Sequence, residues 1–163
     1  MDQQQITFYN NYHSLADQAS ANLKISPYIV LAQWALESGW GSASYVPSTH
    51  NLAGIMKTSR VVQSFVSFEQ FLSAYTASMR NDCPVIKGGK STPQMTASEV
   101  FAGTDYNTAN PNYAATIQNI ADTISSYVAS LHPSQPSQPS QPSQTLVLLE
   151  EAMMTLSKLK NLL

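Results

Sequence analysis

Four consecutive copies of Pro-Ser-Gln occupy residues 133–144, and a packed domain cannot contain such a segment. A proline at every third position removes backbone hydrogen-bond donors and favours an extended polyproline II chain. The repeat therefore predicts a linker that divides the 163-residue chain into a main domain, residues 1–132, and a tail, residues 145–163. The main domain is long enough to bury a hydrophobic core of its own.

The charge and cysteine content excludes several classes of function. With 8 Lys+Arg against 10 Asp+Glu, the chain lacks the basic surface that nucleic-acid binding requires. Its single cysteine, Cys83, cannot form an internal disulfide, and its three histidines lack the spacing of metal ligands. We therefore expect no metal and no other cofactor. Nowhere do about 18 apolar residues follow one another, so we also expect no transmembrane segment.

Helical patterns dominate the first half of the main domain. Apolar residues recur at helical spacing over residues 5–23. Ser26 followed by Pro27 is typical of a helix start and predicts a second helix through Leu36. Only residues 60–66, rich in β-branched and aromatic side chains, favour a strand.

The second half adds further helix starts. Ser67 with Gln70, and Thr96 with Glu99, each match the capping-box pattern, in which two residues three apart cap a helix reciprocally. An apolar stripe predicts a last long helix that opens at Asn110-Pro111 and ends at His132-Pro133. The main domain is therefore expected to be mainly α, with a small β element.

The tail, residues 145–163, reads as an amphipathic helix. Its two acids lie early and its two lysines late, which suits the helix dipole, and leucines widen its apolar face. An unpaired helix this apolar would expose a large hydrophobic surface to solvent. We expect the tail to self-associate or to dock on a partner such as a virion component. The alternative is a helix that binds a membrane surface.

Glu37 is the most conspicuous acid of the main domain. It follows Leu36 at the end of an apolar helix and lies close to Trp34 and Trp40 in the sequence. Partial burial there would raise its pKa and make it a general acid, while Trp40 could stack on a sugar ring. The alternative is a solvent-facing Glu in a last helical turn capped by Gly39, with Trp40 in the core.

A family resemblance starts from the same residues. The stretch IVLAQWALESGWG, residues 29–41, resembles the signature of the glucosaminidase domain, glycoside hydrolase family 73, whose members are bacterial and phage peptidoglycan hydrolases. The family's three further motifs have similar counterparts in the same order: Asn51–Lys57, Phe65–Phe68 with the later Tyr75, and Tyr106–Ala114. Together the four motifs cover about residues 26–128.

The resemblance implies a lysozyme-like α+β fold, with a helical lobe, a small β-hairpin lobe and a groove for the glycan. It implies that Glu37 is the catalytic acid. Asn51 and Gly54 match the motif that shapes the site beside it, and Tyr106 and Tyr113 match tyrosines of which one lines the cleft. The implied reaction is cleavage of the β-1,4 bond after N-acetylglucosamine.

The chain also departs from the family pattern. Ala53 stands where the family usually has Phe, and Trp34 where it usually has a small residue. Family members often have a second Glu on the hairpin, but residues 58–64 contain no acid. Asp105 and Glu69 are the remaining candidates for a second carboxylate. Each also has a structural interpretation, Asp105 as a turn residue and Glu69 as an acid favoured by a helix N-terminus.

Several alternatives remain open at this level. A lytic transglycosylase or a muramidase on the same fold is the main alternative reaction. A non-catalytic glycan-binding module is the alternative outside enzymes. We expect action on the cell wall, in the periplasm or outside the cell. The first residues lack the regions of a secretory signal peptide, so we expect delivery by a phage, release through a holin, or another export route.

Overall fold

The computed structural model describes residues 1–131 of the chain. Residues Met1–Ser130 form one compact unit, which is described here by itself. The linker predicted for residues 133–144 and the helix predicted for residues 145–163 lie outside the described residues.

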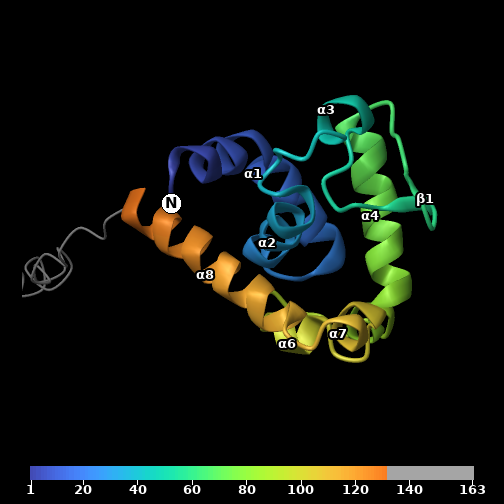
Figure 1. Cartoon of the computed structure of the whole chain (residues 1–163). Coiled ribbons are helices and arrows are strands. Elements are labelled where there is room, and N and C mark those ends of the chain that lie inside the picture. Colours follow the sequence, from blue (N-terminus) through green and yellow to red (C-terminus); the bar gives the residue numbers. More distant parts are fainter. Residues whose placement is uncertain (132–163) are drawn as a thin grey trace, which may run out of the picture. The chain divides into compact units, whose positions relative to one another are not determined.

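The compact unit is mainly helical, with one small antiparallel hairpin (Figure 1). This arrangement confirms the predicted fold class. The elements in chain order are α1 (Gln3–Leu23), α2 (Pro27–Ser38), α3 (Val46–Thr49), β1 (Met56–Thr58), β2 (Val61–Val62), α4 (Phe68–Asp82), α5 (Pro84–Lys87), α6 (Ala97–Val100), α7 (Asp105–Ala109) and α8 (Tyr113–Leu131). None of the helices within residues 1–131 is both long and apolar enough to span a membrane.

The first two helices start where side chains satisfy their free backbone N–H groups. Asp2 and Gln5 form a reciprocal capping box, so α1 begins two residues earlier than its apolar pattern predicts. Ser26 accepts a hydrogen bond from the backbone N–H of Tyr28, as expected for the N-cap of α2. The helix continues to Ser38, two residues beyond the predicted end.

One of the two predicted capping boxes forms completely, and the other forms only in part. Thr96 and Glu99 form both halves of the box at the start of α6. At α4, Ser67 accepts from the N–H of Gln70, but the Gln70 side chain accepts from the N–H of Val66 instead of that of Ser67. The second box is therefore only half formed, although α4 starts at the predicted position.

The strand predicted for residues 60–66 is mostly wrong. Only Val61–Val62 pair as β2, and β1 lies before the predicted segment. The buried side chain of Asn51 explains the early end of the ladder. It donates to the carbonyl groups of Ile55 and Gln63 and accepts from the N–H of Ile55. The Gln63 N–H still donates to the Ile55 carbonyl, but the reciprocal bond from Ile55 N–H to the Gln63 carbonyl is replaced by the two bonds to the side chain.

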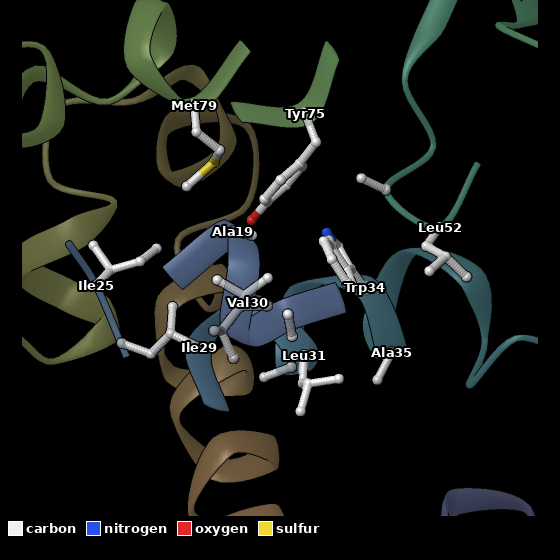
Figure 2. Close-up of a cluster of buried hydrophobic side chains, with 14 of the residues drawn as sticks. Ala19, Ile25, Ile29, Val30, Leu31, Trp34, Ala35, Leu52, Tyr75 and Met79 are labelled. Atoms are coloured by element: carbon white, nitrogen blue, oxygen red, sulfur yellow. The ribbon is translucent and has the colours of Figure 1, made fainter. Parts of the chain in front are cut away.

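Helix α2 lies at the centre of the unit, and most of its residues are buried. Helix α1 packs against both α2 and α4. The fully buried Trp34 ring of α2 makes an edge contact with Tyr75 of α4 (Figure 2). It makes a second edge contact with Phe71 of the same helix. Because α2 is enclosed on several sides, its last turn is held in a fixed place, and that turn contains Glu37.

Candidate active site

Glu37 lies half-buried in the last turn of α2. The helix ends directly after it because Gly39 adopts the left-handed conformation, φ 57°, and donates its N–H back to the last turn. Burial raises the pKa of the Glu37 carboxyl, and the hydrogen bond from Tyr113 partly offsets that rise. The raised pKa is the property that the sequence predicted for this side chain.

Three groups lie close to Glu37, two at its side-chain carboxyl and one at its backbone carbonyl. The Tyr113 hydroxyl of α8 donates to Glu37 Oε1 at 2.9 Å. The Tyr45 hydroxyl donates to the Glu37 backbone carbonyl, also at 2.9 Å. On the other side, a Cβ placed on Gly54 would lie 3.6 Å from Glu37 Oε2. Oε1 is therefore occupied by a hydrogen bond, while Oε2 faces the bare backbone of Gly54.

Tyr106 and Tyr113, both predicted to shape the site, lie together. Their rings stack with centroids 5.3 Å apart and an interplanar angle of 18°. Burial, followed by the negative charges of Asp82 and Glu37, raises the pKa of Tyr106 to about 12. Burial also raises the pKa of Tyr113 well above its usual range, so both hydroxyls stay protonated and can donate hydrogen bonds near neutral pH.

A cavity of about 570 Å³ lies beside Tyr106. Its other lining residues are Asn81, Asp82, Gly103, Asp105 and Ala109. The cavity thus extends from the tyrosine stack toward the C-terminal end of α4 and the start of α7. Asp105, predicted as a candidate second carboxylate, is exposed and contributes to this lining.

Two further residues connect to Glu37 that sequence reasoning did not select. Gln33 donates from Nε2 to the Tyr113 hydroxyl at 3.0 Å and accepts at Oε1 from the Tyr75 hydroxyl at 2.7 Å. Gln33 and Tyr75 are both nearly completely buried. A single amide within the apolar run of α2 was the signal available in the sequence, since buried polar groups need partners.

The other predicted residues are not among the groups that contact Glu37. Asn51 is completely buried and organises the hairpin. Trp40 packs edge-on against Phe8 and lines a separate hollow of about 300 Å³ beside α1. Glu69 is exposed in the first turn of α4, where its hydrogen bond with Ser67 lowers its pKa.

Nothing in residues 1–131 groups three or more His, Cys, Asp or Glu side chains in a way that could hold a metal ion. Cys83 is buried, and burial raises the pKa of its thiol to about 12. A thiol with that pKa stays protonated and is a poor nucleophile at neutral pH. Near Glu37 the structure places a partly buried carboxyl, with the Tyr113 hydroxyl on its Oε1 and the Tyr45 hydroxyl on its backbone carbonyl.

Comparison with protein families shows which family the chain resembles. The family described as glucosaminidase, mannosyl-glycoprotein endo-beta-N-acetylglucosaminidase, matches residues 13–126. This range includes Glu37, Gly54 and both stacked tyrosines. No curated protein sequence matches the chain significantly.

Solved structures with a similar fold include the following three bacterial proteins. A chain of a type VI secretion system effector-immunity complex from Pseudomonas protegens has a TM-score of 0.62 and 17% identity over 78% of this chain and 96% of that one. A peptidoglycan hydrolase from Sphingomonas sp. A1 has a TM-score of 0.59 and 19% identity over 83% and 99%. A truncated glycoside hydrolase domain of Salmonella typhimurium FlgJ has a TM-score of 0.58 and 19% identity over 74% and 97%.

Proposed function

From the premise that this chain belongs to the glucosaminidase family of glycoside hydrolases, we propose that Glu37 is the general acid that cleaves a peptidoglycan glycan strand. The observation that supports this role is the geometry of its carboxyl. Burial keeps a proton on it to higher pH, and the Tyr113 hydroxyl occupies Oε1. The acid proton then resides on Oε2, the oxygen beside Gly54.

The first step is proton transfer from Glu37 Oε2 to the glycosidic oxygen. The bond between that oxygen and the anomeric carbon breaks, and Glu37 is left as a carboxylate. The Tyr113 hydrogen bond stabilises this charged form, since a donor to a carboxylate favours ionisation. In the second step the carboxylate accepts a proton from the water that attacks the anomeric carbon, which restores the acid.

The group that stabilises the anomeric carbon is not a carboxylate of the hairpin. Residues 55–63, which contain both strands, include no Asp or Glu. We propose that the 2-acetamido group of the substrate attacks the anomeric carbon through its carbonyl oxygen and forms an oxazoline ring, which water then opens with retention. Asp105, in the cavity beside Tyr106, is the protein carboxylate that remains a candidate, whereas the exposed and acidic Glu69 suits the role less well.

The structural relatives support peptidoglycan as the substrate of this chain. The Sphingomonas protein is described as a peptidoglycan hydrolase, and it shares the fold over most of both chains. The family description adds the bond specificity of an endo-β-N-acetylglucosaminidase. The enzyme would accordingly act on the cell wall and leave N-acetylglucosamine at each new reducing end.

Digestion of purified peptidoglycan tests the bond. The products are reduced with borohydride and identified by mass spectrometry, with Glu37→Gln as the matched inactive control. Glucosaminitol ends support the proposed reaction. Muramitol ends would show a muramidase, and anhydromuramic ends would show a lytic transglycosylase. Turnover by Glu37→Gln equal to that of the unchanged enzyme would refute the role of Glu37.

For the tail, residues 145–163, we propose self-association or docking on a partner, with the Pro-Ser-Gln segment as spacer. The composition supports this proposal, because leucines widen the apolar face of the predicted helix. Sedimentation of the full chain and of residues 1–132 is the test. A larger mass for the full chain alone supports self-association, whereas two monomers leave partner or membrane binding.

A further inference from the structure

A chain of three hydrogen bonds connects the buried core to the candidate general acid. The Tyr75 hydroxyl of α4 donates to Gln33 Oε1, Gln33 Nε2 donates to the Tyr113 hydroxyl, and Tyr113 donates to Glu37 Oε1. The three contacts measure 2.7, 3.0 and 2.9 Å in that order. In each of the three bonds, the donor is the residue nearer the core and the acceptor is the residue nearer Glu37.

The direction of this chain depends on the Gln33 amide. A tyrosine hydroxyl has one hydrogen to donate, whereas a glutamine has an accepting end and a donating end. If the Gln33 amide were reversed, its oxygen would face Tyr113 and its NH₂ group would face Tyr75. Tyr113 would then donate its only hydrogen to Gln33, and Glu37 Oε1 would lose its donor.

Trp34, the neighbour of Gln33 on α2, favours the observed direction. Its ring lies 5.2 Å from that of Tyr75, centroid to centroid, and both rings belong to the same buried cluster (Figure 2). Burial raises the pKa of the Tyr75 hydroxyl well above its usual range, and the indole of Trp34 acts in the opposite direction. The indole N–H itself has no hydrogen-bond partner within ordinary hydrogen-bond distance in residues 1–131.

An indole N–H can only donate, so its influence on the Tyr75 hydroxyl is that of a hydrogen directed toward the Tyr75 oxygen. A second donor, such as a reversed Gln33 amide, would compete for that oxygen and leave the hydrogen of Tyr75 without an acceptor. A buried polar group without a partner is costly. Tyr75 therefore donates to Gln33, and the amide keeps its NH₂ group toward Tyr113.

We propose that Tyr75, Gln33 and Trp34 are positioning residues, which hold the Gln33 amide in one orientation and thereby keep the Tyr113 hydroxyl donating to Glu37. This inference rests on the proposed role of Glu37 as the general acid. It assigns a use to the indole of Trp34, which stands where the family usually has a small residue.

The titratable groups around Glu37 are few. The Tyr113 hydroxyl of α8 lies on its carboxylate, Tyr45 ahead of α3 contacts its backbone, and Tyr106 of α7 interacts with its charge. Asp82 at the end of α4 acts on Tyr106 rather than on the carboxylate directly. Loss of the Tyr113 donor consequently leaves burial as the main influence on Glu37, and its pKa rises.

The direct test measures the pKa of Glu37 by carbon NMR of ¹³C-labelled glutamate carboxyls. The Glu37 resonance is the one that is missing in Glu37→Gln. In Tyr75→Phe we expect its pKa to rise by about half a unit or more, with the alkaline limit of lytic activity moving to higher pH by the same amount. In a Tyr113→Phe background, Tyr75→Phe should add no further shift, because the donor is already absent.

Tyr127→Phe is the matched control, since Tyr127 lies on α8, its ring contacts Tyr9, and it is not a member of the hydrogen-bond chain. It should leave the pKa of Glu37 unchanged. A stable Tyr75→Phe protein with an unchanged Glu37 pKa would overturn the proposal, as would shifts that add in the double variant. A purely structural role for Tyr75 would lower the melting temperature without moving this pKa.

A measurement on the unmodified protein covers the case in which Tyr75→Phe does not fold. Nuclear Overhauser contacts from the Gln33 side-chain amide protons should reach the ring protons of Tyr113 and not those of Tyr75. Contacts to Tyr75 alone would refute the proposed orientation. Activity in Glu37→Gln would instead refute the role of Glu37, and the carboxyl titration would still test the hydrogen-bond chain.

Discussion

The Tyr113 hydroxyl lies 2.9 Å from Glu37 Oε1, although 76 residues separate the two in sequence. The contact opposes the larger influence on Glu37, because burial raises the pKa of the carboxyl and the hydrogen bond lowers it. A general acid needs both effects. It must hold its proton at the working pH and still release it in the transition state. A buried carboxyl without such a donor would hold its proton too tightly.

Glu37→Gln should keep the fold and lose lytic activity by a factor of about 10²–10⁴. Glutamine preserves the shape of the side chain and can still accept from Tyr113, but it has no acidic proton to transfer. Release of soluble fragments from purified peptidoglycan measures the effect. Glu69→Gln is the matched control and should retain most activity, since Glu69 is exposed and paired with Ser67. Equal losses in both folded variants would show that the acids have been assigned wrongly.

The same variant should be more stable than the unchanged protein at pH 7 but not at pH 4. The pKa of Glu37 is raised in the folded state, so its neutral form stabilises the fold fully below the unfolded pKa. That contribution is lost as the pH rises through the folded pKa. The carboxyl is only partly shielded from water, so we expect a gain on the order of 1 °C in Tm at pH 7. A gain that persists unchanged at pH 4 would contradict this linkage.

Gly54→Ala should reduce activity more than its effect on stability explains. Gly54 has φ 60°, and the added methyl group would lie 3.6 Å from Glu37 Oε2, in the space that the leaving oxygen must reach. Gly89→Ala is a matched control because Gly89 has φ 67° with nothing within 4 Å. Both variants should lose about 1 kcal/mol of unfolding free energy through backbone strain. Only Gly54→Ala should lower kcat/KM, and equal activity in the two would contradict the proposed proton transfer from Glu37 Oε2.

Much of the helical architecture could be predicted because its signals are local. Ser26 followed by Pro27, and Thr96 with Glu99, act over a few residues and start helices where expected. The strand prediction failed for the opposite reason. The side chain of Asn51 bonds groups up to 12 residues away, and no pattern within residues 60–66 reveals that competition.

The candidate site likewise contains one residue that the sequence could predict and others that it could not. Glu37 could be selected because an acid in an apolar helix end is visible in the sequence. Tyr113, which donates to Glu37, and Tyr75, which donates to Gln33, come from α8 and α4, and only the packing of these helices around α2 brings both to Gln33. The family resemblance identified Tyr113 as a site residue, but not the direction of its hydrogen bond.

Asn51→Ala should destabilise the hairpin more than the helices. The Asn51 side chain makes three hydrogen bonds, two as donor to Ile55 and Gln63 carbonyls and one as acceptor from the Ile55 N–H. Their removal leaves the partly buried Ile55 N–H and Gln63 carbonyl without partners, at a cost of about 3 kcal/mol in unfolding free energy. Denaturant titration measures that loss. Hydrogen exchange should speed up at the amides of Ile55 and Gln63 while α2 stays protected until global unfolding.

The matched control for this loss is Asn22→Ala. The Asn22 side chain donates only to a backbone carbonyl one turn earlier on the exposed face of α1. Its removal should change stability by no more than about 0.5 kcal/mol. Because the hairpin begins two residues after Gly54, loosening it should also raise KM with a smaller effect on kcat. Uniform faster exchange across α2 and the hairpin would show instead that Asn51 supports the whole core.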